Sequence, residues 1–376
     1  MDVRFSSTCC VIRGRFAVAT MLLLVASHVP EPVQVPLPIA AALITLVVAV
    51  IGTWALAIYF SERSALQLGL GSRTQHAVIV TAHPDDECMF FAPTIATLRR
   101  HGVEVHLLCL STGMHARLFG GGSCGGCLTW CDDVSAGAGD YEGLGERRQQ
   151  ELVDSAAVLG IQPETVTCVD VPELQVLPHA RCRCARARGK PSWWLLPQDA
   201  PQQWDAELVA AAIVASLPEG LLEEALVRWV CTLPLLPPSL RDMVVRAACC
   251  LQFFSFDSYG ISGHLNHQSV YRGLQVLVSS GALDPLQMWC VQSTNRLRKY
   301  SSIVDMTLSC FSCFASACGI TRGPTLLAVN PSMRRVHNCM RAHRSQYVWY
   351  RRLYVAFSRY TFINTLRPLS LRRKLA

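Results

Sequence analysis

Two polar clusters, far apart in the sequence, carry the residue types that could do chemistry. The first, His83-Pro84-Asp85-Asp86-Glu87, places one imidazole and three carboxylates on a single short segment. A turn that only caps a helix needs one carboxylate, so the presence of three points to a chemical role. The second cluster, Phe256 to His267, holds two histidines beside two glycines, which permit close approach of the backbone.

Together the two clusters supply ligands for a divalent metal. His83, Asp86 and a histidine of the second cluster form a His, Asp, His set, a combination that keeps one position open for water at catalytic sites. Asp85 remains as a neighbouring carboxylate that is able to take a proton from that water. The residue types therefore predict a hydrolytic metal site.

Apolar runs precede both clusters and indicate the elements that position them. His76 to Thr81 is typical of a buried strand, Cys88 to His101 of a helix, and Cys249 to Phe254 is a mostly apolar run before the second cluster. A polar turn between a strand and a helix opens the crevice found in doubly wound sheets. Val103 to Leu110 and Val166 to Val171 indicate further strands. We therefore predict an α/β fold, with a Rossmann-like, doubly wound and mostly parallel sheet.

These motifs resemble a known family, the LmbE-like zinc-dependent deacetylases, and within it the enzymes of glycosylphosphatidylinositol (GPI) anchor synthesis. Ala82 to Glu87 carries the Ala-His-Pro-Asp-Asp-Glu motif of the wider family. The Gly-His-x-Asn-His cluster at Gly263 to His267 and the His-Arg-Ser-Gln-Tyr-x-Trp-Tyr-Arg-Arg-Leu-Tyr stretch at His343 to Tyr354 resemble the GPI enzymes. The similar stretches are spread over most of the chain beyond residue 70.

The resemblance implies an activity and a role for each matching residue. The activity is hydrolysis of the N-acetyl group of N-acetylglucosaminyl-phosphatidylinositol, the second step of GPI-anchor synthesis, with a divalent metal that we expect to be Zn²⁺. By this resemblance His83, Asp86 and His267 would hold the metal, and Asp85 would be the general base. His264 would stabilise the oxyanion or donate the proton to the leaving group.

Three other charged residues lie in matching positions. Glu87 is expected to support a metal ligand or to place a negative charge at the start of a helix. Arg148 and Glu151 fall on one face of a helix predicted from Glu146 to Ile161, where the family has Arg-x-x-Glu-Leu. They form either a surface ion pair or contacts with the substrate or with a ligand side chain.

The beginning of the chain predicts membrane attachment. Ile39 to Phe60 contains 22 residues without a charge, which is long enough to span a bilayer, so residues 1–70 are interpreted as a targeting and transmembrane region. Phe16 to Ser27 is either the apolar part of a signal peptide or a partner helix. The eighteen cysteines are irregularly spaced, which favours a reducing compartment over a disulfide framework. With the resemblance, this predicts the endoplasmic reticulum membrane, with the catalytic domain facing the cytosol.

The rest of the chain is expected to hold one deacetylase domain, residues 71–330, with insertions at about 113–142 and 219–250. The first insertion, rich in Gly and Cys, either holds a structural metal or is a flexible loop; the second is apolar and touches the membrane or covers the sheet. Residues 331–376 carry eleven Arg or Lys and no Asp or Glu, interleaved with aromatic residues. They predict a segment at an anionic membrane surface and no nucleic-acid site, because no nucleic-acid module accompanies them.

Two other functions stay open on the sequence. One is an LmbE-like deacetylase of another N-acetylated sugar or glycoconjugate. The apolar run at Ile39 to Phe60 and the basic tail argue against it, because they favour a substrate that lies in a membrane. The other is a non-catalytic membrane scaffold. Such a protein would not need a complete set of catalytic residues, and the sequence has His83, Asp85, Asp86, His264 and His267. Protein partners from the GPI pathway are not identified by the sequence.

Overall fold

A computed structural model describes most of the chain beyond residue 35. The described residues are 36–112, 144–169, 203–221, 250–283, 285–302, 304–320 and 325–369. The chain divides into two units, residues 1–52 and residues 53–376, and the second contains the sheet. The apolar run Phe16 to Ser27 and the insertion at 113–142 lie outside the described residues, as does most of the insertion at 219–250.

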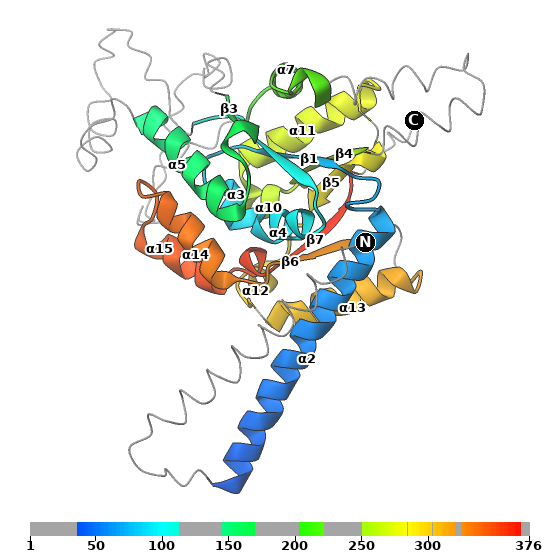
Figure 1. Cartoon of the computed structure of the whole chain (residues 1–376), viewed down its shortest axis with the longest axis vertical. Coiled ribbons are helices and arrows are strands. Elements are labelled where there is room, and N and C mark those ends of the chain that lie inside the picture. The colour runs from blue at the N-terminus through cyan, green and yellow to red at the C-terminus, as the bar shows by residue number, and fades with distance from the viewer. Residues whose placement is uncertain are drawn as a thin grey trace, which may run out of the picture. The chain divides into compact units, whose positions relative to one another are not determined.

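The second unit is built on one seven-stranded sheet (Figure 1). Its strand order is β3-β2-β1-β4-β5-β7-β6. The strands are β1 (His76–Thr81), β2 (Glu104–Cys109), β3 (Val166–Cys168), β4 (Leu251–Phe256), β5 (Met288–Val291), β6 (Leu326–Val329) and β7 (Ile363–Pro368). All neighbours from β3 to β5 pair in parallel, whereas β7 is antiparallel to both β5 and β6. The predicted mostly parallel α/β sheet is confirmed.

Helices cover both faces of the sheet, which explains why its central strand is apolar on both sides. Helices α4 (Ala92–Arg100) and α5 (Leu144–Leu159) lie over one face, and α11 (Leu265–Ser279) lies over the other with α7 (Ala206–Ala215) against it (Figure 1). Every residue of β1 after His76 is buried. A parallel strand that is covered on both faces needs such a continuous apolar run.

The helix predicted from Cys88 to His101 is two helices. Helix α3 (Asp86–Phe90) ends at Phe91, and α4 begins at Ala92. Pro93 lies in the first turn of α4, where its missing N–H is tolerated, but its ring is incompatible with a continuous preceding turn. The prediction of one uninterrupted helix was therefore wrong, and the break leaves α3 as a short element that begins at the polar turn.

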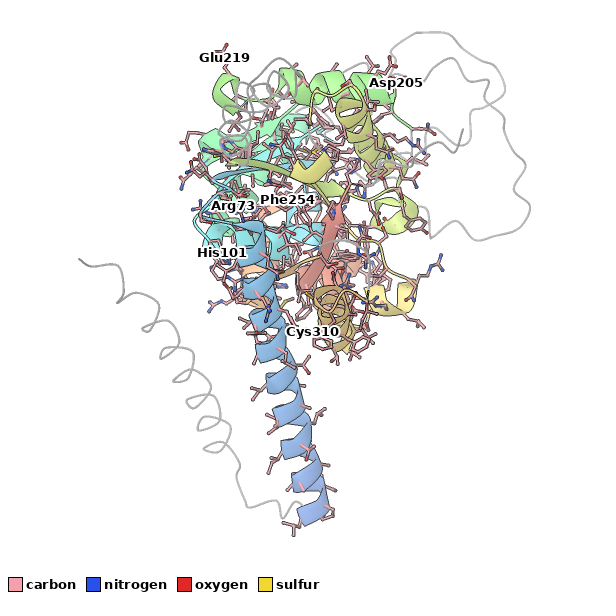
Figure 2. All side chains as sticks on the ribbon, turned by 90° about the vertical axis from the view of Figure 1, so that its right-hand side faces the viewer. Arg73, His101, Asp205, Glu219, Phe254 and Cys310 are labelled. Atoms are coloured by element: carbon pink, nitrogen blue, oxygen red, sulfur yellow. The ribbon has the colours of Figure 1, made fainter. Side chains whose placement is uncertain are left out.

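Helix α2 (Leu37–Leu68) contains the whole predicted span and is the one described helix that is long and apolar enough to cross a membrane. Up to Gly52 nearly all its side chains are exposed. From Thr53 onward it packs on protein, because Ala57 joins an apolar cluster with Met306, Cys310 and Cys313 of α13 (Val304–Ala317) (Figure 2). The backbone N–H of Leu327 donates to the Ser64 hydroxyl over 3.1 Å.

The end of the chain belongs to the sheet body. Strand β7 pairs between β5 and β6, and helices α14 (Met333–Ala342) and α15 (Trp349–Phe357) precede it. Residues 333–368 are thus an integral part of the fold and not an appended segment. The contact of this part with a membrane surface stays a prediction.

Candidate active site

The two polar clusters meet because the strands before them are neighbours. Strand β1 pairs with β2 on one side and with β4 on the other, so the chain reverses its winding direction here. The turn after β1 and the segment after β4 therefore lie side by side at the carboxyl ends of parallel strands. Doubly wound sheets bind their ligands at this position.

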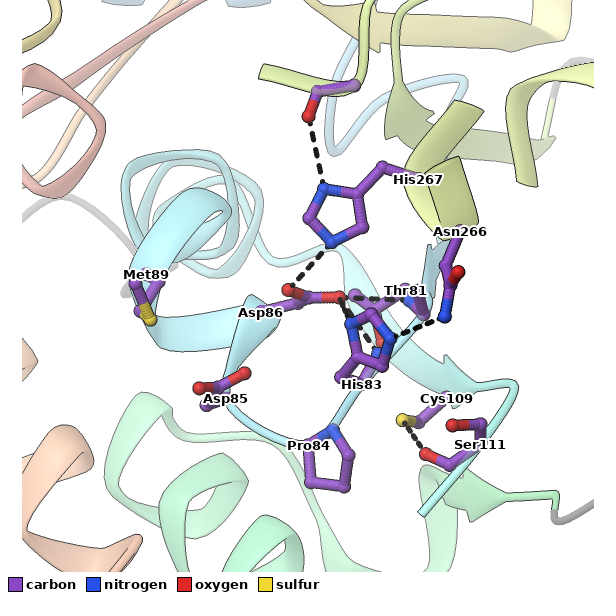
Figure 3. Close-up of polar contacts among 12 residues, drawn as sticks. Thr81, His83, Pro84, Asp85, Asp86, Met89, Cys109, Ser111, Asn266 and His267 are labelled. Carbon is purple, nitrogen blue, oxygen red and sulfur yellow. Dashed lines mark hydrogen bonds and ion pairs between the residues drawn. The ribbon is translucent and has the colours of Figure 1, made fainter. Parts of the chain in front are cut away.

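Three imidazoles and one carboxylate converge there. Asp86 lies between two histidines (Figure 3), with Oδ2 3.7 Å from Nδ1 of His83 and Oδ1 3.3 Å from Nε2 of His267. His264 joins the same group, since one ring nitrogen of each of the three histidines lies within 4.8 Å of the others. The structure thus brings together all the residues that were predicted to hold a metal, although the residues share no element.

The orientation of His267 fits a metal ligand. Its Nδ1 lies 3.1 Å from the carbonyl oxygen of Gly260, so Nδ1 carries the donated proton and Nε2 is the nitrogen left for a proton or a metal ion. Nε2 is buried, has no hydrogen-bond partner among the described residues, and faces a carboxylate oxygen of Asp86. Two electron-rich atoms at this distance repel each other unless a proton or a cation lies between them. The donor set suits a divalent ion such as zinc.

Gly260 makes the approach of His267 possible. Its φ angle is +66°, and a Cβ atom at this position would lie 2.8 Å from Cβ of His267. Only glycine avoids both the backbone strain and the collision. The glycine noted in the sequence beside the histidines thus has a specific geometric role.

Asp86 is held by the backbone of its own turn. Its Oδ2 accepts hydrogen bonds from the backbone N–H groups of Ala82, over 3.0 Å, and His83, over 2.9 Å. Burial alone would raise the pKa of Asp86, but the positive charge of protonated His267, with that of His83, outweighs burial and holds that pKa well below its usual range. The carboxylate is therefore ionised and oriented, with Oδ1 directed at His267.

Asn266 orients the other imidazole. Its side-chain amide lies 2.9 Å from Nε2 of His83, which leaves Nδ1 of that ring facing Asp86. The sequence offered a signal for this residue, because Asn266 stands inside the Gly-His-x-Asn-His motif, but it was not assigned a role there.

His264 is held as a neutral imidazole. Burial, followed by the positive charges of His267 and His83, lowers the pKa of His264 to about 3. Its Nδ1 is buried and has no hydrogen-bond partner among the described residues. A neutral ring with a free nitrogen in this position can donate or accept one hydrogen bond to a group that enters the site.

Asp85 has a strained backbone that its neighbours stabilise. Its φ of 126° and ψ of −17° lie in a region that side chains rarely occupy. The N–H of Asp85 donates to Oε2 of Glu87 over 2.9 Å, and Gln346 donates to the carbonyl of Pro84 over 2.7 Å. The Asp85 carboxylate forms an ion pair with Arg351, and it lies beside Asp86 near Met89 (Figure 3).

Glu87 is the centre of a second, fully buried network. Its Oε1 lies 2.6 Å from the hydroxyl of Ser155, which donates to it, and 2.6 Å from Nε2 of His343. Because Glu87 also accepts from the backbone of Asp85, its side chain connects helix α5, the end of α14 and the polar turn. Glu87 therefore supports the polar turn, and its side chain is bound to His343 and Ser155.

Arg148 and Glu151 are both buried, so they are not a surface ion pair. Arg148 donates from Nη1 to the backbone carbonyl of Thr112 over 3.0 Å. Glu151 accepts a hydrogen bond of 2.9 Å from the backbone N–H of Ser345, and its Oε1 lies 3.3 Å from Nε of Arg147, with which it forms an ion pair. The two side chains therefore connect helix α5 to the segment after β2, at Thr112, and to the segment after α14, at Ser345.

The sequence reading missed His343, Gln346 and Arg351 as parts of this site. All three come from the basic, aromatic end of the chain, yet each contacts the turn between Pro84 and Glu87. The available signal was the resemblance of His343 to Tyr354 to the GPI enzymes. Composition favoured a membrane surface for this stretch, and composition carries no information on which partner a single side chain meets.

Known proteins match this chain in sequence. A family model described as PIG-L, GlcNAc-PI de-N-acetylase, matches residues 78–234. The N-acetylglucosaminyl-phosphatidylinositol de-N-acetylase of Bos taurus is 29% identical over 302 residues, covering 80% of this chain and 85% of the relative. A protein of Schizosaccharomyces pombe named as a probable enzyme of the same activity is 28% identical and covers 77% and 85% of the two chains.

Among solved structures, the N,N'-diacetylchitobiose deacetylase of Pyrococcus horikoshii is 15% identical, with a TM-score of 0.33 over 74% of this chain and 75% of that one. The family model covers the turn that supplies His83, Asp85 and Asp86. On the family match over residues 78–234 and the curated relatives, which align over most of both chains, the chain is similar to the PIG-L family of de-N-acetylases.

Proposed function

We propose that the chain is a membrane-bound, metal-dependent amide hydrolase. Its substrate is N-acetylglucosaminyl-phosphatidylinositol, and its products are glucosaminyl-phosphatidylinositol and acetate, the second step of GPI-anchor synthesis. The names of the curated relatives support this substrate. The single observation that carries the chemistry is the convergence of three imidazoles on the Asp86 carboxylate, with Nε2 of His267 3.3 Å from Oδ1 of Asp86.

His83, Asp86 and His267 would hold the metal. We take the ion to be Zn²⁺, because two imidazole nitrogens and one carboxylate oxygen form a common catalytic zinc set. When bound, such an ion polarises a carbonyl group and lowers the pKa of water. The hydrogen bonds of His267 to the carbonyl of Gly260, of His83 with Asn266, and of Asp86 with the turn backbone keep the three ligand side chains in the required orientation.

Asp85 and His264 supply proton transfer and charge stabilisation. Asp85 takes a proton from the attacking water and later delivers it to the amine nitrogen as the amide bond breaks. Its ion pair with Arg351 holds the carboxylate in place. His264, neutral at physiological pH because its pKa is lowered to about 3, donates a hydrogen bond to the oxyanion that develops on the acetamide oxygen.

The location follows from the apolar helix and the chemistry of the substrate. Helix α2 would anchor the chain in the endoplasmic reticulum membrane, so that the sheet body works on a glycolipid at the bilayer surface. The body faces the cytosol in this proposal, because its many cysteines suit a reducing compartment.

The decisive experiment is a deacetylation assay on the purified full-length protein. The acetate and the free amine from synthetic N-acetylglucosaminyl-phosphatidylinositol are measured before chelation, after chelation, and after add-back of Zn²⁺ or other divalent ions. We expect activity that chelation abolishes and zinc restores. Cleavage of other N-acetylglucosaminides but not of this lipid would assign a different sugar substrate. Stoichiometric metal without any cleavage would indicate a scaffold.

A further inference from the structure

A second hollow lies between helices α14 and α15 and contains none of the residues of the metal cluster. Its volume is about 390 Å³. Arg334, His337, Asn338 and Arg341 line it from α14, and Arg352 and Ala356 line it from α15. A hollow of this size can receive a small charged group such as a lipid headgroup.

Helical spacing explains why these residues gather. Residues 334, 337, 338 and 341 follow the i, i+3, i+4, i+7 pattern, so they share one face of α14. The other face of α14 carries Val336, Cys339 and Met340, which are buried in the core. Burial of the apolar face therefore turns the basic face toward α15, where Arg352 meets it across the hollow.

The hollow is strongly positive. Three guanidinium groups line it, no Asp or Glu does, and no described carboxylate forms an ion pair with Arg334, Arg341 or Arg352. Some arginines of the body are paired with carboxylates, as Arg351 is with Asp85. Burial lowers the pKa of His337, and Arg341 and Arg352 lower it further, which reflects the same positive field.

An apolar stripe adjoins the hollow on α15. Trp349, Leu353 and Phe357 follow at i, i+4 and i+8, and their exposed fractions are 71%, 50% and 54%. Arg352 and Ala356 stand immediately before Leu353 and Phe357, so the stripe continues the wall of the hollow around the helix. A soluble anion has no apolar part to contact these exposed aromatic and aliphatic side chains. A phospholipid has both a phosphate for the arginines and acyl chains for the stripe.

We propose that this hollow binds the phosphate group of an anionic phospholipid, while Trp349, Leu353 and Phe357 enter the outer acyl region. Guanidinium groups match phosphate oxygens in pairs, and three of them around one space favour a doubly contacted phosphate. The site is separate from deacetylation, so it goes beyond the function proposed above.

The test measures lipid retention and not catalysis. Full-length protein is placed in phosphatidylcholine nanodiscs that contain a small share of a photoactivatable phosphatidylinositol, and the covalently captured lipid is mapped by mass spectrometry. Arg334→Gln with Arg341→Gln should lower capture on α14 and α15 by roughly fivefold for each arginine removed. Arg335→Gln removes the same charge from an exposed position of α14 that does not line the hollow, and it should leave capture unchanged.

Two further arms identify the source of the phosphate. Inorganic phosphate and glycerophosphoinositol are added in excess as competitors, and Leu353→Gln with Phe357→Gln removes the apolar stripe. We expect the stripe variant to lose lipid capture and the soluble competitors to displace little lipid. Unchanged capture in the double arginine variant, or the same loss in Arg335→Gln, overturns the site. If inorganic phosphate displaces all of the captured lipid and the stripe variant captures lipid normally, the site binds phosphate and the assignment of a lipid ligand is wrong.

Discussion

Nε2 of His343 lies 2.6 Å from Oε1 of Glu87, although 256 residues separate them along the chain. Both side chains are fully buried. Through Glu87, which accepts the backbone N–H of Asp85, the end of helix α14 is connected to the strained residue of the polar turn. The last part of the chain therefore helps to fix the geometry of the polar turn.

Removal of this contact should destabilise the fold. His343→Ala leaves a buried carboxylate oxygen with one partner fewer, and we expect the free energy of unfolding to fall by roughly 1.5–3 kcal/mol. Denaturant unfolding of the detergent-solubilised protein measures the loss. Arg147→Ala, which removes the half-exposed i, i+4 partner of Glu151, should cost about 0.5 kcal/mol or less. Equal losses of unfolding free energy in the two variants would show that the buried contact stabilises the fold no more than the exposed ion pair does.

Metal content tests the ligands. Asp86→Ala and His267→Ala should each lose both bound metal and activity, because two remaining donors hold a divalent ion poorly. Elemental analysis of the purified variants gives the stoichiometry. Asp205→Ala is the matched control: it removes a carboxylate that caps helix α7, should cost about 1 kcal/mol of stability, and should keep the metal. Full metal in both site variants would exclude this ligand set.

Asp85 is expected to act on protons and not on the metal. Asp85→Asn keeps the size of the side chain and leaves His83, Asp86 and His267 in place, so metal should still bind. Turnover should fall by roughly a hundred- to ten-thousandfold, as is typical when a positioned acid–base group is lost. Metal content and turnover are measured on the same sample. Loss of metal in this variant, with normal metal in Asp86→Asn, would mean that the two carboxylates have exchanged roles.

Arg351 should act as a positioning residue for Asp85. Arg351→Ala is expected to lower kcat while metal content and KM stay close to normal, because the guanidinium forms an ion pair with Asp85. Arg351→Lys should keep the charge but lose the planar geometry, and so give an intermediate rate. Added guanidinium ion should restore part of the activity of Arg351→Ala. A rise in KM without a change in kcat would place Arg351 in substrate binding.

The orientation of the body can be tested with one substitution. Ser72→Asn, followed by Arg73 and Thr74, completes an Asn-x-Thr glycosylation acceptor on an exposed turn. A cytosolic body predicts that the acceptor stays unmodified in microsomes. Protease added outside sealed microsomes should also digest the body. Efficient glycosylation together with protease protection would reverse the proposed orientation.

Local sequence determined much of this protein. The run His76 to Thr81 and the polar turn after it are encoded within a few residues, so the strand, the turn and the two chemical clusters were predictable. The long apolar helix α2 was also predictable, because an uncharged run of this length is visible in the sequence without knowledge of tertiary contacts. The resemblance to the family added the proposed roles of the individual histidines and carboxylates.

Only the tertiary structure decided which distant residues complete the site. The φ of 126° at Asp85 and the contacts of His343, Gln346 and Arg351 depend on chain segments that meet after folding. Periodicity reports which face of an element is apolar, but it does not report which polar side chain lies opposite a given carboxylate. For the same reason the basic end of the chain suggested a peripheral segment, whereas pairing of β7 inside the sheet makes it part of the catalytic body.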